Sequence, residues 1–270
     1  MASSNPVLTR PGAFEPQGYA PYPGQQQAFP GQPGYPADPS AYVPQAAGPL
    51  MTLDDVITKS AITMGVLAAT AAATMALLPL TVIYPAMIVS GIVGFVAVLF
   101  VTMRRVINPA AVIAYAAIEG LFIGALSKVF ELRYPGIVIQ AVVGTFLAAG
   151  VTLASYKYFQ IKVTPKFRRM VFIGTASFAG VMLLNMVLSM FGINLGLRGV
   201  GGFSLLGVIA SLVGIVLAVM NLMWDFDIVE RGVANRAPAS ESWRAAFGLT
   251  VTMVWLYTEL LRILSYFRSN

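Results

Sequence analysis

The 270-residue chain carries a formal net charge of +6, yet only 10% of its residues are charged and 57% are hydrophobic. Soluble domains contain about 25% charged residues, so this composition predicts an integral membrane protein. The chain has neither cysteine nor histidine. This excludes thiolate nucleophiles and zinc–cysteine sites, as well as membrane serine proteases, zinc proteases and b-type haem proteins that depend on histidine. We therefore expect neither an enzyme nor a resident cofactor.

Residues 1–50 are rich in Pro, Gly, Gln and Tyr and show no apolar periodicity. Their start, MASSNPVLTRPG, lacks the apolar core of a cleavable signal peptide. This composition predicts a disordered cytoplasmic tail at 1–50, followed by a transmembrane domain at 51–270. The Pro and Tyr content is compatible with docking of a protein partner, although a solubilising tether is the simpler interpretation.

The remainder of the chain divides into apolar segments long enough to span a bilayer. Thr52 is placed to cap a first helix, with Asp54 and Asp55 in its first turn. Residues 60–103 contain no charge and are too long for one crossing, so Pro79 and Pro85 predict a turn between two helices. Further spans are predicted at 109–130, 135–156, 170–192, 203–224 and 243–267. The predicted fold class is an all-α membrane protein with seven transmembrane helices.

The basic residues are distributed unevenly between the two sides of these spans. If the tail is cytoplasmic, the opposite side receives few of them: Lys128, Arg133, Arg198 and Arg268. Cytoplasmic loops carry the Lys and Arg excess, so the N-terminus is predicted inside and the C-terminus outside. The basic segment at 156–169, YKYFQIKVTPKFRR, lies between two spans. Anionic lipid headgroups are therefore its expected partner, rather than nucleic acid.

Five charged residues lie near or inside the apolar segments: Glu119, Asp225, Asp227, Glu259 and Arg262. An ionisable side chain at bilayer depth costs roughly 2.5 to 3.5 kcal/mol on insertion scales. Such a residue persists where a partner, a cavity or a function offsets that cost. These five residues are the candidates for a functional site.

Glu259 and Arg262 are spaced i and i+3, so they share a helix face and are predicted to form an ion pair. Arg262 alternatively extends toward the outer surface. An ion pair within one helix leaves carboxylate lone pairs without donors, and lipid supplies none. We therefore favour a Glu259 that faces the interior of the helix bundle and acts in function.

Glu119 lies ten residues into the third span, about 15 Å from its start and thus near the membrane centre. Gly120 and Gly124 beside it form a pattern of small residues that allows close helix packing. Two interpretations stay open: an ion-path carboxylate, and an interhelical hydrogen bond without a transport role.

Asp225 and Asp227 lie in NLMWDFDIVERG, where the sixth span is predicted to end at the cytoplasmic border. Two positions that are two residues apart point to different sides of a helix, so these acids need not form one site. Two interpretations of Asp225 and Asp227 stay open: an ordinary acidic helix end, and a role in an ion path.

The segments LMWDFDIVERG and VWLYTELLRILSYF resemble the sixth and seventh helices of the Bax inhibitor-1/YccA family, and EGLFIGALSKVFE resembles its bacterial branch. The resemblance implies a calcium-leak channel or calcium/proton exchanger of the bacterial plasma membrane. It implies a pH-sensitive pair of acids, here Asp225 and Glu259, that also holds the transported or bound calcium. Many relatives have aspartate in place of Glu259. Glu119 and Asp227 are additional ion-path candidates.

Two carboxylates held close in a low dielectric cannot both ionise cheaply, so such a pair can share a proton, and calcium prefers oxygen ligands. The predicted spans nevertheless place Asp225 and Glu259 at depths that differ by on the order of 10 to 20 Å. Either a helix is broken or tilted, or the acids are staggered along a path.

The alternative function is a non-transporting membrane scaffold or a regulator of a membrane protease, a role also associated with some relatives. In that case the tail or the basic loops recruit the partner.

Overall fold

A computed structural model describes residues 48–269 apart from 105, 160, 194 and 198–203. Over these residues the chain forms the helices α1 (Leu53–Leu77), η1 (Leu80–Val82), α2 (Ile83–Met103), α3 (Pro109–Arg133), α4 (Ile137–Tyr158), α5 (Pro165–Met190), α6 (Leu205–Ala234) and α7 (Glu241–Arg268). Within the described residues, seven of these segments are long and apolar enough to cross a bilayer. The predicted all-α fold with seven transmembrane helices is confirmed. The predicted disorder of the tail concerns residues that lie almost entirely outside the described part of the chain.

Polar side chains begin several of these helices. Thr52 Oγ1 accepts a hydrogen bond from the backbone of Asp55 at 3.2 Å, as predicted. The side chains of Asn108, Thr164 and Ser204 cap α3, α5 and α6 in the same way. Pro79 lies between α1 and α2 as predicted. Pro85, by contrast, lies within the first turn of α2, where proline is tolerated.

The sixth helix is longer than its hydropathy predicts. The predicted span ends at Trp224, but α6 continues to Ala234. Its last turns carry Asp227 and Arg231, and the buried Asp227 forms ion pairs with Arg231 and with the partly exposed Arg168. The helix therefore continues past the apolar stretch that hydropathy identifies. Asp225 therefore lies nine residues, about 14 Å, inside the end of α6, and the prediction that it stands at the helix end is wrong.

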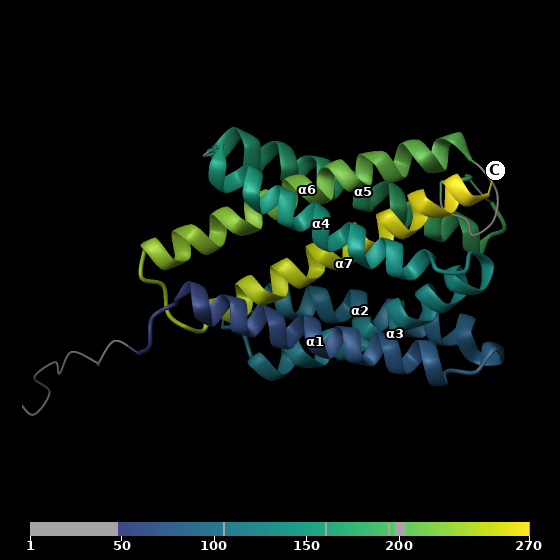
Figure 1. The fold of residues 1–270 in the computed structure, drawn as a ribbon, viewed down its shortest axis with the longest axis horizontal. Helices are drawn as coiled ribbons and strands as arrows, with labels where there is room; N and C mark the ends of the chain where they lie inside the picture. Colours follow the sequence, from purple (N-terminus) through teal and green to yellow (C-terminus); the bar gives the residue numbers. More distant parts are fainter. Residues whose placement is uncertain (1–47, 105, 160, 194, 198–203, 270) are drawn as a thin grey trace, which may run out of the picture. The chain divides into compact units, whose positions relative to one another are not determined.

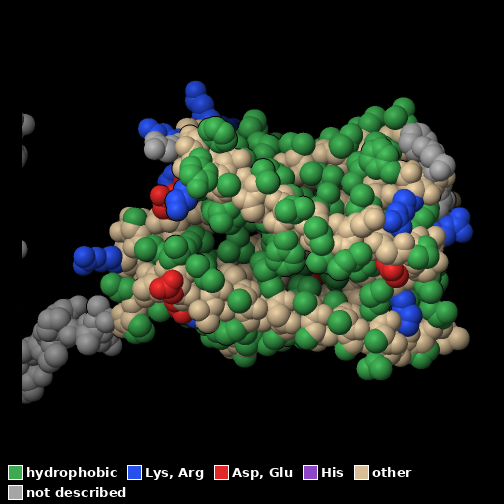
Figure 2. All heavy atoms as spheres, in the orientation of Figure 1, with side chains coloured by type: hydrophobic (Ala, Val, Ile, Leu, Met, Phe, Trp, Pro, Cys, Tyr) green, Lys and Arg blue, Asp and Glu red, His purple; other side chains and the backbone are tan. Residues whose placement is uncertain are grey.

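The helix α7 runs between two groups of helices, with α1, α2 and α3 on one side and α4, α5 and α6 on the other (Figure 1). It contacts α1, α3, α4 and α6 and is the most buried of the membrane-spanning helices described. Figure 2 shows hydrophobic side chains over the middle of the helices and most charged side chains toward their two ends. A bilayer-embedded protein requires this distribution.

The helices α1 and α3 approach closely at Gly120 and Gly124. A Cβ atom at Gly120 would overlap the Thr70 hydroxyl, and one at Gly124 would overlap the Ala71 carbonyl oxygen. The contact that the small-residue pattern predicts is therefore present, with α1 as the partner helix.

The segment just before α1 is joined to the loop between α6 and α7. Met51 N donates to the Ala237 carbonyl at 2.7 Å, and Ala239 N donates to the Pro49 carbonyl at 2.8 Å. Lys59 Nζ also donates to the Ala239 carbonyl at 3.0 Å. Met51 is 3% exposed. Residues 49–51 therefore belong to the helical body.

Candidate functional site: a carboxylate at a cavity

A cavity of about 420 Å³ lies between α2, α6 and α7, near the beginning of α1. Its lining mixes apolar residues with polar ones, including Thr102, Asp225, Glu241, Arg244 and Thr252. Arg244 Nε and Glu241 Oε2 are 2.7 Å apart and form an ion pair. The lining is therefore largely apolar and carries a few polar and charged groups.

Asp225 is the acidic residue of α6 that lines this cavity. Thr252 of α7 donates a hydrogen bond to its Oδ2 at 2.6 Å. Gly248, one turn earlier in α7, leaves room for the carboxylate, since a Cβ there would stand 3.5 Å from Oδ1. Among the described residues, no Lys or Arg forms an ion pair with Asp225. No basic side chain of the described residues therefore neutralises this carboxylate.

Asp227 takes part in a separate network of ion pairs. It is 5% exposed, and its oxygens lie 3.2 Å from Arg168 Nη2 of α5 and 3.0 Å from Arg231 Nε of α6. Arg231 also donates to the Val163 carbonyl at 3.1 Å. The network joins α6 to α5 and to the segment before it. Asp227 therefore holds helices together and does not line the Asp225 cavity.

Glu259 lies in the interior between α6 and α7 and is 1% exposed. Its Oε2 accepts from Arg262 Nη1 at 3.4 Å, and its Oε1 accepts from Trp255 Nε1 at 3.3 Å. The side chain packs on Gly214 of α6, where a Cβ would stand 2.8 Å from Glu259 Cδ. The structure therefore places Glu259 at the interior position favoured by the sequence and pairs it with Arg262.

The structure does not bring Asp225 and Glu259 together. Asp225 meets α7 at Thr252, whereas Glu259 meets α6 at Gly214. Asp225 and Gly214 are eleven residues apart in α6, which corresponds to about 16 Å along the helix. Calcium ligands lie about 2.3 to 2.6 Å from the ion, so one calcium cannot bind both acids in this structure. The two acids are therefore separated along the bundle, and whether a path joins them stays a prediction.

Glu119 lies at nearly the same depth as Asp225. The Tyr115 ring of α3 packs edge-on against the Phe247 ring of α7, with centroids 5.0 Å apart. Glu119 follows Tyr115 by four residues, and Thr252 follows Phe247 by five. Because α3 and α7 lie side by side and run in the same direction (Figure 1), Glu119 reaches the level of the hydrogen bond between Thr252 and Asp225.

The Glu119 carboxylate points at α2. A Cβ at Gly94 would stand 2.9 Å from its Oε2, and Val98, one turn further along α2, lines the Asp225 cavity. Within the described part of the chain, no hydrogen bond to Glu119 is found. The same part of the chain contains no cluster of three acidic side chains close enough to hold a metal ion.

Sequence reasoning missed the residues that define the surroundings of these acids, namely Thr252, Gly248, Gly214, Gly94 and Arg168. Each lies on a different helix from its acid, and no spacing pattern links them. Gly248, Gly214 and Gly94 each lie opposite an acidic residue of a neighbouring helix. This pattern can be recognised only when it is known which residues of the two helices face each other.

These features define a multi-pass membrane protein whose spanning helices carry acidic side chains in the interior, one of them at a cavity. The chain belongs to the Bax inhibitor 1 like family, because the family model with that description matches residues 5–269. The resemblance found in the sequence is thereby confirmed at the level of the family. No curated protein matches the chain in a sequence comparison.

Proposed function

We propose that this protein carries calcium ions across a membrane, as a pH-sensitive leak channel or a calcium/proton exchanger, with Asp225 at the ion entrance. The observation that supports this function is the position of Asp225 at a cavity of about 420 Å³, bonded to a single neutral hydroxyl. A carboxylate in such a place attracts a hard cation when ionised and loses that attraction when protonated. Membership of the Bax inhibitor 1 like family supports the same function.

The other acids have different roles in this proposal. Glu119, at the depth of Asp225, is the second carboxylate along the ion path. Glu259 lies roughly 16 Å further along the bundle, and its ion pair with Arg262 closes the path there. Asp227 maintains the packing of α5 against α6 and does not bind the ion.

In this proposal the protein lies in the plasma membrane of a bacterium, with its N-terminus in the cytoplasm and its C-terminus outside. The cytoplasmic end would then carry the basic segment at 156–169, with exposed lysines at Lys162, between α4 and α5, and at Lys166, in the first turn of α5. These side chains are placed to contact anionic lipid headgroups. The N-terminal tail binds a protein partner. The proposal includes no binding of nucleic acid, no enzymatic reaction and no resident cofactor.

Liposomes loaded with a calcium dye test the transport function. The parent protein should admit calcium at a rate that changes with pH. Asp225→Asn should lower the rate by on the order of tenfold, equivalent to about 1.4 kcal/mol, and should remove the pH dependence. Asp54→Asn, which changes an exposed acid in the first turn of α1, should behave like the parent. A pH-dependent flux that persists unchanged in Asp225→Asn would refute the role of this residue.

The second candidate function is a non-transporting scaffold or a regulator of a membrane protease. The observation in its favour is Glu259, which is enclosed in the interior with Arg262 and Trp255. This function is indicated if the parent protein admits no more calcium than protein-free liposomes while deletion of residues 1–45 abolishes capture of a partner.

A further inference from the structure

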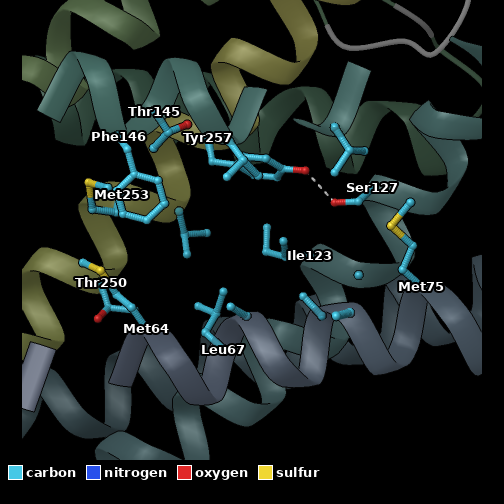
Figure 3. A pocket seen from close by; sticks show the side chains of 17 residues that line it. Met64, Leu67, Met75, Ile123, Ser127, Thr145, Phe146, Thr250, Met253 and Tyr257 are labelled. Atoms are coloured by element: carbon cyan, nitrogen blue, oxygen red, sulfur yellow. Dashed lines mark hydrogen bonds between the residues drawn. The ribbon is translucent and has the colours of Figure 1, made fainter. Parts of the chain in front are cut away.

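Another cavity, of about 270 Å³, lies between α1, α3, α4 and α7 (Figure 3). Met64 and Leu67 of α1 lie across it from Phe146 of α4 and Met253 of α7, and Met75 of α1 lies at its other end, near Ser127. Most of the lining is aliphatic, aromatic or thioether. Apolar cavities of about 150 Å³ already stay dry and bind small apolar molecules, so this cavity is large enough for an apolar ligand.

The few polar groups in the lining are satisfied by the protein itself. The hydroxyls of Ser127 and Tyr257 are 2.7 Å apart and bond to each other, as Figure 3 shows. Thr145 donates to the carbonyl of the residue four positions earlier in α4 at 2.7 Å, and Thr250 does the same in α7 at 2.8 Å. The protons of Thr145 and Thr250 are thus used within their own helices, and of the two hydroxyls of Ser127 and Tyr257 only one keeps an unused proton, so the lining offers few donors to a polar ligand. This cavity therefore differs in chemistry from the one at Asp225.

The cavity opens toward the hydrocarbon of the bilayer. The helices α1 and α4 do not contact each other, and a hollow lies between them on the face shown in Figure 2. Phe146, which lines the cavity, is 59% exposed. Met64 and Met75 are eleven residues apart in α1, so the cavity extends for about 16 Å along that helix. This is about half of the 30 Å hydrocarbon core, as suits an elongated chain from one leaflet.

A lysine lies beside the end of the cavity formed by Met75 and Ser127, without lining it. Lys128 follows Ser127, and its Nζ donates to the Leu78 carbonyl at 2.7 Å, just beyond the end of α1. In the described part of the chain, no carboxylate lies within ion-pair distance of Lys128. An ammonium group has three donors, so two remain for a ligand. An anionic group at the membrane surface matches this position.

We propose that this cavity binds one acyl chain of an anionic glycerophospholipid, with the Lys128 ammonium beside the phosphate. The lipid belongs to the leaflet at the end of the bundle where α1 ends. This ligand is specified by the length of the cavity, its apolar lining, its opening between α1 and α4 and a lysine that has no carboxylate partner among the described residues. The site is separate from the Asp225 cavity and does not depend on calcium transport.

Photo-crosslinking tests the acyl-chain site. The full chain is reconstituted in phosphatidylcholine vesicles that contain a small fraction of phosphatidylglycerol with a diazirine in one acyl chain, and the labelled peptides are identified by mass spectrometry. Label should concentrate on the lining of α1 and α4 around Leu67 and Phe146. Ala72→Phe on α1 and Val142→Trp on α4 fill the cavity from opposite walls, and each should lower this label on the order of tenfold.

The matched control is Ala69→Phe, which enlarges an exposed position of α1 outside the lining and should leave the label unchanged. Thermal unfolding identifies any variant that fails to fold. Because the two filling variants change different helices, one of them can test the site if the other does not fold. Label spread evenly over the lipid-facing helices, and unaffected by either filling variant, would show an ordinary lipid shell and overturn the proposal.

The headgroup is tested with photoactivatable phosphatidylglycerol and phosphatidylcholine that carry the same chain. The parent should prefer the anionic lipid, and Lys128→Gln should abolish that preference because it removes the charge while keeping a donor for Leu78. Lys166→Gln, which removes an exposed lysine from the first turn of α5, should retain the preference. Equal labelling by both lipids in the parent would overturn the anionic assignment.

Discussion

Thr252 of α7 donates a 2.6 Å hydrogen bond to the carboxylate of Asp225 on α6. The two residues are 27 positions apart in the sequence, and their contact fixes the depth at which the acid meets α7. It also gives one neutral donor to the carboxylate of a residue that lines the cavity.

Replacing Thr252 by valine removes this donor while keeping the shape of the side chain. A hydrogen bond to a charged group contributes about 1.5 to 3 kcal/mol, so we expect the free energy of unfolding in detergent to fall by about that amount. Thr252→Ser keeps the hydroxyl and should stay close to the parent. Equal unfolding free energies for Thr252→Val and the parent would show that the bond contributes nothing.

The buried pair of Glu259 and Arg262 should show strong energetic coupling. Arg262→Met leaves the carboxylate of Glu259 without its cation, and breaking a buried ion pair on one side costs about 3 to 5 kcal/mol. The double variant Glu259→Gln/Arg262→Met should recover much of that loss, since no charge remains. A double-mutant cycle on unfolding free energies measures the coupling, and additive effects would contradict the ion pair.

Gly214 should not tolerate a side chain, because an added Cβ would stand 2.8 Å from Glu259 Cδ. We expect Gly214→Ala to destabilise the protein by about 1 to 3 kcal/mol, the usual cost of overpacking. Gly180→Ala is the matched control: a Cβ there meets nothing within 4 Å, and the change should stabilise α5 by roughly 0.5 to 1 kcal/mol. Thermal melting curves of the two variants should therefore move in opposite directions.

Substitution of Asp227 should lower stability and leave calcium flux unchanged, whereas substitution of Asp225, two residues earlier, should lower the flux. Asp227→Asn leaves Arg168 and Arg231 without their carboxylate and should lower stability by about 1 to 3 kcal/mol. Calcium entry per folded molecule should stay near the parent value, because Asp227 does not line the cavity. A loss of flux as large as that expected for Asp225→Asn would place Asp227 on the ion path.

The helices were predictable from sequence because apolar length alone determines which segments can cross a bilayer. The pair of Glu259 and Arg262 was predictable as well, since i and i+3 positions share a helix face whatever the tertiary fold. The end of α6 was not. Hydropathy falls at Asp225 and Asp227 and so indicates the end of a span there, whereas the helix continues, and Asp227 pairs with Arg168, which lies 59 residues earlier in the chain.

The relative depths of the acids depend on helix register. The contact between Tyr115 and Phe247 sets the register of α3 against α7, and neither residue carries a pattern that identifies its partner. Glu119 was expected deeper in the membrane than Asp225 because α6 was expected to end at residue 224. With the helix continuing to Ala234, the two acids share a level.

The backbone contacts between residues 49–51 and the loop at Ala237–Ala239 set the place where the chain can be cut or fused. Met51 lines the Asp225 cavity, and its sulfur would stand 2.7 Å from a Cβ at Gly232. A deletion that extends through residue 51 therefore removes part of a wall as well as the tail. Affinity tags, fluorescent fusions and tail deletions should end before Gly48, so that a change in transport reports on the tail and not on a breach in the cavity.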